Sequence, residues 1–209
     1  MNIQSQMSNY AKQHLDQRAS EALAYFPTVD IDPQQITMIM INEVVANTPE
    51  NDFYSSDPQA AYLNTTLPLL QKAGLSVHSM ADILALGIYV TSAVKLPKRS
   101  TTIQKEQLAE SLPLLEKELG LFPNVRAMML NGDVAKKKVN QLTKAQSGKN
   151  AIPAVSTYKL RNSEIYYRAI RLFPAYIMTG KNILIEKSKV DMTAADIAKM
   201  VAYVASCNS

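Results

Sequence analysis

Apolar and polar positions divide the chain into short apolar runs and longer stretches with helical spacing. Four runs, bounded by polar residues or breakers, predict buried β-strands at 36–41, 87–94, 125–131 and 165–173. Apolar residues recurring every three or four positions predict helices at 3–25, 57–72, 79–86, 102–119, 134–142 and 193–205. Because strands and helices alternate, we expect an α/β class with three layers, α/β/α, around a mainly parallel four-stranded sheet.

The stretch Ile36–Tyr54 changes from apolar to polar in its middle. Its first half is almost wholly apolar, as expected for a parallel strand buried on both faces. Its second half brings together Asn42, Glu43, Asn47, Glu50, Asn51, Asp52, Phe53 and Tyr54. Open α/β sheets place their sites at the carboxyl ends of the strands, so this stretch is the first candidate for a site. The alternative is a polar loop between a strand and a helix.

Size and composition fit one domain over 1–209, with a helical extension at 1–30 and a C-terminal helix at 190–209. No apolar run approaches the roughly 20 residues that cross a bilayer, and the N-terminus lacks the apolar centre of a signal peptide. The single Cys207 excludes an internal disulfide and a multi-cysteine metal site. We therefore expect a cytoplasmic monomer without membrane contact.

The net charge of +4 is divided unevenly along the chain. Residues 1–125 carry 8 Lys and Arg against 13 Asp and Glu, whereas residues 126–209 carry 14 against 5. A basic C-terminal part beside an acidic loop favours a polyanionic partner, with nucleic acid as the first candidate. The alternative is that the run Lys136–Lys138 only solvates a helix face.

Four short motifs follow one another along the chain. They are Asn-Glu-Val-Val-Ala at 42–46, Ile-Tyr-Val-Thr-Ser-Ala-Val-Lys at 88–95, Gly-Asp-Val-Ala at 132–135 and Phe-Pro-Ala-Tyr at 173–176. Their order and spacing, with the helices between them, resemble the uracil-DNA glycosylase superfamily, nearest to its iron–sulfur-containing bacterial and archaeal branch. That branch carries Gly-Glu-Ala-Pro-Gly, a (V/I)YITNVVK pattern and His-Pro-Ser at the first, second and fourth places. The resemblance covers residues 36–180 and implies a hydrolase of base-excision DNA repair.

Four positions depart from that branch. Leu96 and Ser111 stand where two cluster-ligating cysteines would be, so we expect no iron–sulfur cluster, no other cofactor and no metal. Phe173 replaces the histidine of His-Pro-Ser, and Ser92 replaces the asparagine of the second-strand motif. In relatives those two groups polarise or read the uracil, so both departures bear on the identity of the base and on activity.

The resemblance implies a catalytic role for polar residues of the first-strand loop. Glu43 matches the family's motif acid, and a carboxylate beside the sugar stabilises the positive charge that develops there and orients a water. Asp52 is a second acid within reach, and Asn42 adds an amide. The alternative for Glu43 is a carboxylate that caps a helix or braces a loop.

The resemblance also implies a pocket for a base turned out of the duplex. We expect Phe53, or else Tyr54, to stack on the base, with Ser92 and Phe173 lining the same pocket. The alternative for the aromatic rings is ordinary packing in the core.

Residues that follow the second and fourth strands are expected to contact DNA. Phosphate contacts supply most of the affinity, and an apolar wedge fills the gap left by an extruded base. The expected phosphate contacts are Lys95, Lys98, Arg99 and Lys181, and the expected wedge is Ile177 or Met178. Ordinary packing is the alternative for these two apolar residues.

Three functions follow, in order of preference. The first is a DNA glycosylase of the uracil-DNA glycosylase type, which hydrolyses the N-glycosidic bond of a flipped uracil or other deaminated base. The second is a catalytically silent DNA-binding relative, favoured by Ser92 and Phe173. The third is an unrelated α/β enzyme acting on a small phosphorylated or nucleotide substrate.

Overall fold

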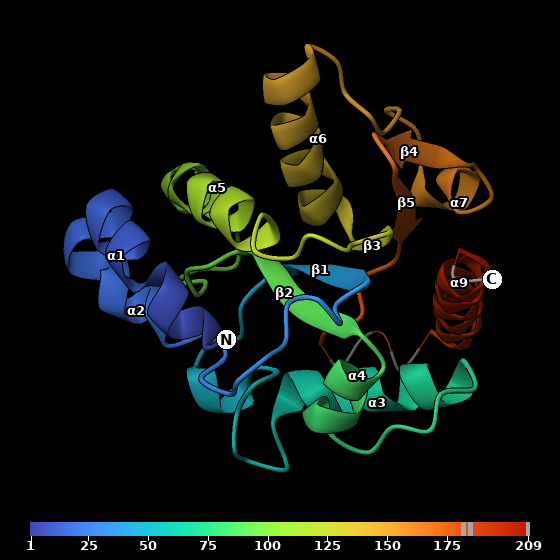
Figure 1. Ribbon diagram of the computed structural model, residues 1–209, viewed down its shortest axis with the longest axis horizontal. Coiled ribbons are helices and arrows are strands. Elements are labelled where there is room, and N and C mark those ends of the chain that lie inside the picture. The colour runs from blue at the N-terminus through green and yellow to red at the C-terminus, as the bar shows by residue number, and fades with distance from the viewer. Residues whose placement is uncertain (181–182, 184–185, 208–209) are drawn as a thin grey trace.

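The computed structural model describes residues 1–180, 183 and 186–207, and its centre is a five-stranded sheet (Figure 1). The strands lie in the order β2-β1-β3-β5-β4. They are β1 (Met38–Val44), β2 (Ile88–Val94), β3 (Ala127–Asn131), β4 (Ile165–Tyr167) and β5 (Ile170–Ala175). The first three and β5 are parallel, so their carboxyl ends meet at one edge of the sheet, which we call the carboxyl edge.

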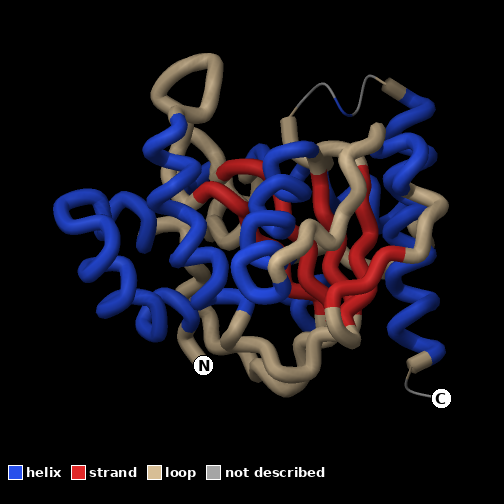
Figure 2. The backbone as a smooth tube through the Cα atoms, turned by 90° about the horizontal axis from the view of Figure 1, so that it is seen from above, coloured by secondary structure: helices blue, strands red, loops and turns tan. Residues whose placement is uncertain are grey.

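Helices cover both faces of this sheet, and Figure 2 shows the strands enclosed between them. One face packs against α5 (Lys105–Leu119), α6 (Asp133–Ser147) and the N-terminal helices α1 (Ile3–Leu15) and α2 (Ala19–Leu23). The other face packs against α3 (Ala61–Lys72), α4 (Met80–Ala85) and α9 (Lys187–Ser206). Ile39 and Ile41 belong to the first core, whereas Met38 and Met40 belong to the second. The strand lacks an apolar–polar alternation because both of its faces are buried.

The expected α/β class and three layers are confirmed, but the number of strands is not four. The run at 165–173 is a hairpin, in which β4 pairs antiparallel with β5. Arg168 makes the turn with a φ of 54°, a left-handed conformation that breaks the strand. A tight turn without Gly, Pro, Asn or Asp gave the sequence pattern no signal of this reversal.

Two helices are longer than the sequence pattern indicates. The fifth expected helix, 134–142, is α6 and continues to Ser147, where Gly148 ends it with a φ of 76°. The expected C-terminal helix begins at Lys187 rather than near 193. Short helical turns at η1 (Asp16–Arg18), η2 (Pro49–Asn51) and α7 (Thr157–Leu160) lie in the connections. Across the part of the chain that the structure describes, no helix combines the length and apolarity of a membrane span.

A buried ion pair joins β2 to α5. The Lys95 ammonium lies 2.5 Å from a Glu118 carboxylate oxygen, and their side chains are 3% and 1% exposed. The hydroxyl of Tyr89 donates to the other Glu118 oxygen at 2.7 Å, and that of Thr91 donates to the same carboxylate at 3.0 Å. Burial, followed by the Glu118 charge, raises the pKa of Tyr89 well above its ordinary value, so this hydroxyl stays a donor. The carboxylate is thus paired and hydrogen-bonded, the condition for burying a charge.

The same lysine also fixes neighbouring segments. Its backbone N–H donates to the Ser111 hydroxyl at 2.9 Å, which ties the exit of β2 to α5 a second time. Its ammonium lies 4.9 Å from the ring centroid of Phe26, which follows α2. Lys95 therefore connects the N-terminal helices, the edge strand and α5.

Replacing Glu118 with Leu should lower the free energy of unfolding by about 3–5 kcal/mol, because it leaves the Lys95 charge buried without a partner. The double variant Lys95→Met/Glu118→Leu should lose much less, because neither charge remains. Urea unfolding monitored by circular dichroism measures both. Equal losses in the single and double variants would contradict this role for the pair.

Candidate functional site

A row of three polar side chains lies just inside the carboxyl edge. Asn42 in β1 pairs in register with Ser92 in β2, and Asn131 ends β3 on the other side of β1. Each follows apolar residues of the α3/α9 core at two-residue intervals, so all three side chains face that core. The Asn131 amide donates to the Asn42 carbonyl oxygen at 3.3 Å, and the Asn42 amide donates to the Thr91 backbone carbonyl at 3.3 Å. We call Ser92, Asn42 and Asn131 the polar row.

The polar row has unused hydrogen-bonding capacity. Ser92 is 3% exposed and Asn131 is fully buried. The Ser92 hydroxyl oxygen and the Asn131 carbonyl oxygen have no hydrogen-bond partner among the described residues. A buried polar group without a partner costs about 1–3 kcal/mol. These two groups lie on the strands that flank β1, and each lowers the stability of the fold unless a ligand gives it a partner.

Two aromatic rings belong to the core on the same face as the polar row. Phe53 is 1% exposed, and its ring centroid lies 5.4 Å from that of Tyr62, a residue of α3. The Tyr62 hydroxyl donates to the Val44 carbonyl at 3.1 Å, at the end of β1. Burial, and then the Asp52 carboxylate, raise the pKa of Tyr62 to about 12, against a lowering by the nearby Thr179 side chain. Tyr62 thus links the loops after β1 and β5.

Glu43 points to the opposite face from the polar row. Its Oε1 accepts a hydrogen bond from the Val134 backbone N–H at 3.0 Å, in the first turn of α6. Gly132 lies directly beside it with a φ of 99°, and a Cβ there would stand 2.4 Å from Glu43 Oε1. The second carboxylate oxygen has no hydrogen bond from a described residue, and the side chain is partly exposed. Glu43 therefore caps α6 and keeps one oxygen available.

Asp52 braces the loop that follows β1. Its two carboxylate oxygens accept from the Ala46 N–H at 2.7 Å and from the Phe53 N–H at 2.8 Å. Burial is the largest influence on its pKa and raises it, while these two hydrogen bonds and the Lys95 charge lower it. The pKa of Asp52 is raised overall, so the folded structure disfavours the ionised form of this carboxyl.

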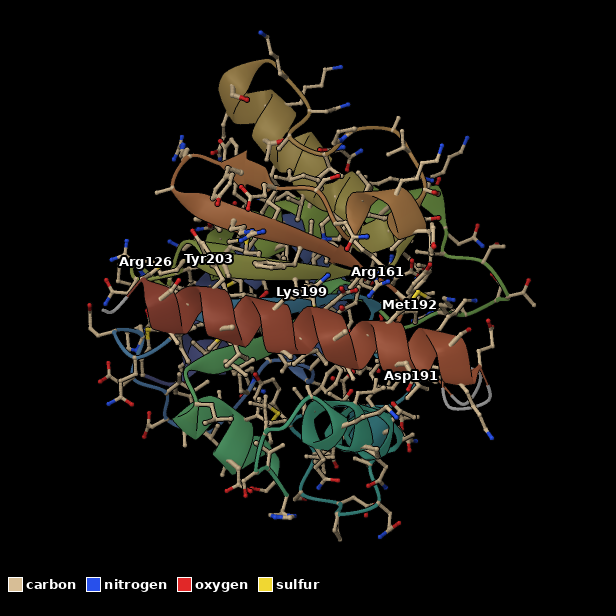
Figure 3. All side chains as sticks on the ribbon, turned by 90° about the vertical axis from the view of Figure 1, so that its right-hand side faces the viewer. Arg126, Arg161, Asp191, Met192, Lys199 and Tyr203 are labelled. Carbon is tan, nitrogen blue, oxygen red and sulfur yellow. The ribbon has the colours of Figure 1, made fainter. Side chains whose placement is uncertain are left out.

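Of the residues expected in the base pocket, Tyr54 lies elsewhere, whereas Phe173 lies on the face of the polar row but in β5, beside α9. Tyr54 covers the outer edge of β2, where its hydroxyl donates to the Val90 carbonyl at 2.9 Å and accepts from the Val90 N–H at 3.3 Å. Phe173 is 7% exposed and packs under α9, with its ring 6.0 Å from Tyr203 and 4.8 Å from the Arg171 guanidinium carbon. Figure 3 shows Tyr203 on α9 above this part of the sheet. Of the expected pocket residues, Phe53, Ser92 and Phe173 share the face of the polar row.

Two of the expected DNA contacts are buried. Lys95 is 2% exposed and is held by Glu118, so it cannot serve as a phosphate contact. Met178 is fully buried in the α3/α9 core and is not available as a wedge, whereas Ile177 is 42% exposed. An apolar pair on a short loop commonly divides in this way, with one side chain in the core and one outside.

The remaining cationic contacts lie beyond β2. Lys98 is partly exposed, and Arg99 is exposed and forms an ion pair with Glu21 at 3.0 Å. The expected contact Lys181 lies outside the described residues. The cationic rim beside the carboxyl edge therefore depends on Lys98 and Arg99 among the described residues.

Sequence reasoning missed Asn131 and Tyr62. Asn131 ends its strand as Asn42 nearly ends β1, so comparing strand ends would have found it. Tyr62 lies inside a helix, and no local pattern indicates that its hydroxyl reaches the end of β1.

Metal binding at this site receives no support from the side chains. Within 1–180, 183 and 186–207, no three His, Cys, Asp or Glu side chains gather in a way that could hold an ion. Cys207, the single cysteine, is exposed at the end of α9.

No protein-family model and no curated protein matches the chain. Among solved structures it is similar to the wild-type UNG crystal structure from Nitratifractor salsuginis, at 14% identity and a TM-score of 0.41. That alignment covers 94% of this chain and 92% of that one. Strand order and register, rather than this likeness, define the fold.

The contribution of Asp52 to the free energy of unfolding should fall as the pH rises. Because its pKa is raised in the folded protein, its contribution is complete below the ordinary aspartate pKa of about 3.9 and is lost as the pH rises through the folded value. The difference in unfolding free energy, wild type minus Asp52→Asn, should therefore decrease from pH 4 towards neutrality. Denaturant unfolding across this range measures it, and a difference that grows with pH would contradict the assignment.

Proposed function

We propose that this protein binds DNA at the carboxyl edge and hydrolyses the N-glycosidic bond of a base turned out of the helix, as a glycosylase of the uracil-DNA glycosylase type. The observation that supports it is the polar row with two buried, unpartnered oxygens. An extruded base is read through hydrogen bonds to its edge and through stacking on an apolar or aromatic side chain. The row supplies the first and Phe53 the second.

The row matches the edge of an oxo-pyrimidine such as uracil. Such an edge presents carbonyl acceptors beside an N–H donor. The Ser92 hydroxyl can donate to a carbonyl, and the Asn131 carbonyl oxygen can accept from the N–H. Binding would give both unpartnered oxygens a partner, which converts an instability of the free protein into affinity.

Entry of a base requires Tyr62 to move. Its hydroxyl bond to the Val44 carbonyl closes the approach from the carboxyl edge. A single neutral hydrogen bond contributes about 1 kcal/mol, so opening is within reach of the energy that DNA binding supplies. The exposed Ile177, on the loop after β5, would fill the gap in the duplex, while Lys98 and Arg99 contact phosphates.

Glu43 would supply the chemistry. As the bond from C1′ to the base breaks, the base takes the electron pair and the sugar becomes positive. The available Glu43 oxygen can stabilise that charge and accept a proton from the water that adds to C1′, while the departing base is protonated by solvent. A sugar lying across the carboxyl edge would have the polar row on one side and Glu43 on the other.

The second candidate is a DNA-binding relative without catalysis. It is favoured by the closed arrangement of Phe53 and Tyr62 and by the commitment of Glu43 Oε1 to α6. It differs from the first candidate in one measurable property, the release of a base.

The deciding experiment incubates the protein with oligonucleotides that carry uracil or other deaminated bases, at low salt, followed by alkali. We expect strand scission at the modified position and a loss of about a hundredfold or more in Glu43→Gln, because the carboxylate that takes the proton of water is gone. DNA binding by this variant should be unchanged. Binding without scission by the wild type would favour the silent relative, and the absence of both would exclude the two candidates.

Ser92→Ala separates function from stability. Removing an unpartnered buried hydroxyl should leave the melting temperature unchanged or higher, while release of the base falls because one contact is lost. Thr193→Val is the matched control, since it removes another buried and unpartnered hydroxyl, on α9. Equal effects of the two variants on base release would rule out recognition by the polar row.

A further inference from the structure

Cationic residues are concentrated in α6 and the segment that follows it. Residues 133–161 contain seven cationic side chains, namely Lys136, Lys137, Lys138, Lys144, Lys149, Lys159 and Arg161, against the single acid Asp133. This excess exceeds the net charge of the whole chain, +4. The candidate site at the carboxyl edge uses none of these residues.

A groove of about 540 Å³ runs between α6 and the segment at 150–160, which returns from the far end of the helix to α7 (Figure 1). Lys137, Gln141 and Lys144 lie along one side of α6 and form its polar wall. Ile152, Pro153, Ala154, Val155 and Leu160 form its apolar side. We call this feature the basic groove.

Hydrogen bonds between α6 and the returning segment fix the shape of the basic groove. The Asn140 side chain donates to the Ile152 carbonyl at 2.9 Å and accepts from the Ile152 N–H at 2.8 Å. The Thr143 hydroxyl accepts from the Ala151 N–H at 3.2 Å, and the Lys136 ammonium donates to the Thr157 hydroxyl at 2.5 Å. These contacts anchor the returning segment along the length of α6.

Three of the seven cations are committed to the fold. Lys136 pairs with Asp133 at 2.7 Å, and Lys138 donates to the Leu108 carbonyl at 2.7 Å. Arg161 reaches α9, where it donates to the Met192 carbonyl at 2.8 Å and pairs with Asp196 (Figure 3). Of these three, Lys136 alone is among the residues that line the groove, and all three are already engaged by groups of the protein.

The other four cations are exposed. For Lys137, Lys144, Lys149 and Lys159, no carboxylate of a described residue lies within ion-pairing distance. Lys137 and Lys144 are seven residues apart, which places them about 10 Å apart along the helix axis. Unpaired cations along one preformed groove fit a linear polyanion better than a single small anion.

Two exposed apolar side chains lie in the segment that borders the groove: Val155 lines it, and Tyr158 follows Thr157, whose hydroxyl accepts from Lys136. Tyr158 in α7 is 67% exposed, and Val155 is 49% exposed. An aromatic ring next to a basic groove is the combination that binds single-stranded nucleic acid, because bases stack on the ring while cations follow the phosphates. An acidic peptide could pair with the cations, but it has no base to stack on the ring.

We infer that the basic groove is a binding surface for single-stranded nucleic acid, with Lys137 and Lys144 contacting phosphates and Tyr158 stacking on a base. One end of the groove, at Asp133, adjoins the first turn of α6, which Glu43 caps. A strand leaving the carboxyl edge could therefore continue along α6. The inference requires no base release and goes beyond the proposed function.

The test measures binding of an undamaged, fluorescein-labelled oligo-dT by anisotropy over a range of salt concentrations. Lys137→Gln/Lys144→Gln should weaken binding and reduce the slope of log K against log salt by about 1.4, since each phosphate contact on a single strand contributes about 0.7. The matched control, Lys12→Gln/Lys117→Gln, removes two exposed lysines of α1 and α5 and should leave the slope unchanged. Equal slopes in the two double variants would overturn the inference.

Variants of Tyr158 distinguish binding of nucleic acid from binding of other polyanions. Tyr158→Ala should weaken oligo-dT binding about tenfold, whereas Tyr158→Phe should retain it, because stacking needs the ring and not the hydroxyl. Binding of an abasic oligonucleotide of equal length should not change in either variant. If Tyr158→Ala leaves oligo-dT binding intact, or weakens the abasic strand equally, the groove is a general polyanion surface and the inference fails. Because the DNA is undamaged, this outcome is independent of any glycosylase activity.

Discussion

The ion pair between Lys95 and Glu118 holds together three parts of the molecule that are distant in the chain. It lies where the edge strand β2 leaves the sheet, beneath α5 and against the ring of Phe26. Two buried charges are stable there only because hydroxyl donors satisfy the carboxylate, with Tyr89 on one oxygen. The exit of β2 is therefore fixed, and with it the position of the segment that carries Lys98 and Arg99 to the carboxyl edge.

The two faces of the sheet treat buried polar groups differently. On the α5 face, the Glu118 carboxylate is fully engaged. On the α3/α9 face, Ser92 and Asn131 retain oxygens without partners. Glu118, Ser92 and Asn131 are each at most 3% exposed, so the difference is not one of solvent access. Thr66 in α3 and Thr193 in α9 also have buried hydroxyls without partners, so Ser92 and Asn131 are distinguished by lying on strands, near the carboxyl edge.

Charge is distributed in agreement with a nucleic-acid partner. In the acidic stretch formed by the end of β1 and the loop after it, Asp52 is buried and one oxygen of Glu43 is bound to α6, whereas Glu50 is exposed. Exposed cations gather at the basic groove and beyond β2. A polyanion would be attracted to these two places.

The sequence by itself determined the alternation of strands and helices, the α/β class and the basic character of the second half. These follow from local spacing and composition, which do not depend on distant partners. Tertiary structure decided the burial of Lys95, because Glu118 lies 23 residues away along the chain. It also decided that Met178 is buried while Ile177 is exposed, that Tyr62 closes the end of β1, and that Asn131 joins Asn42. Each of these outcomes depends on which segments become neighbours in space. A local pattern of residues does not specify those neighbours.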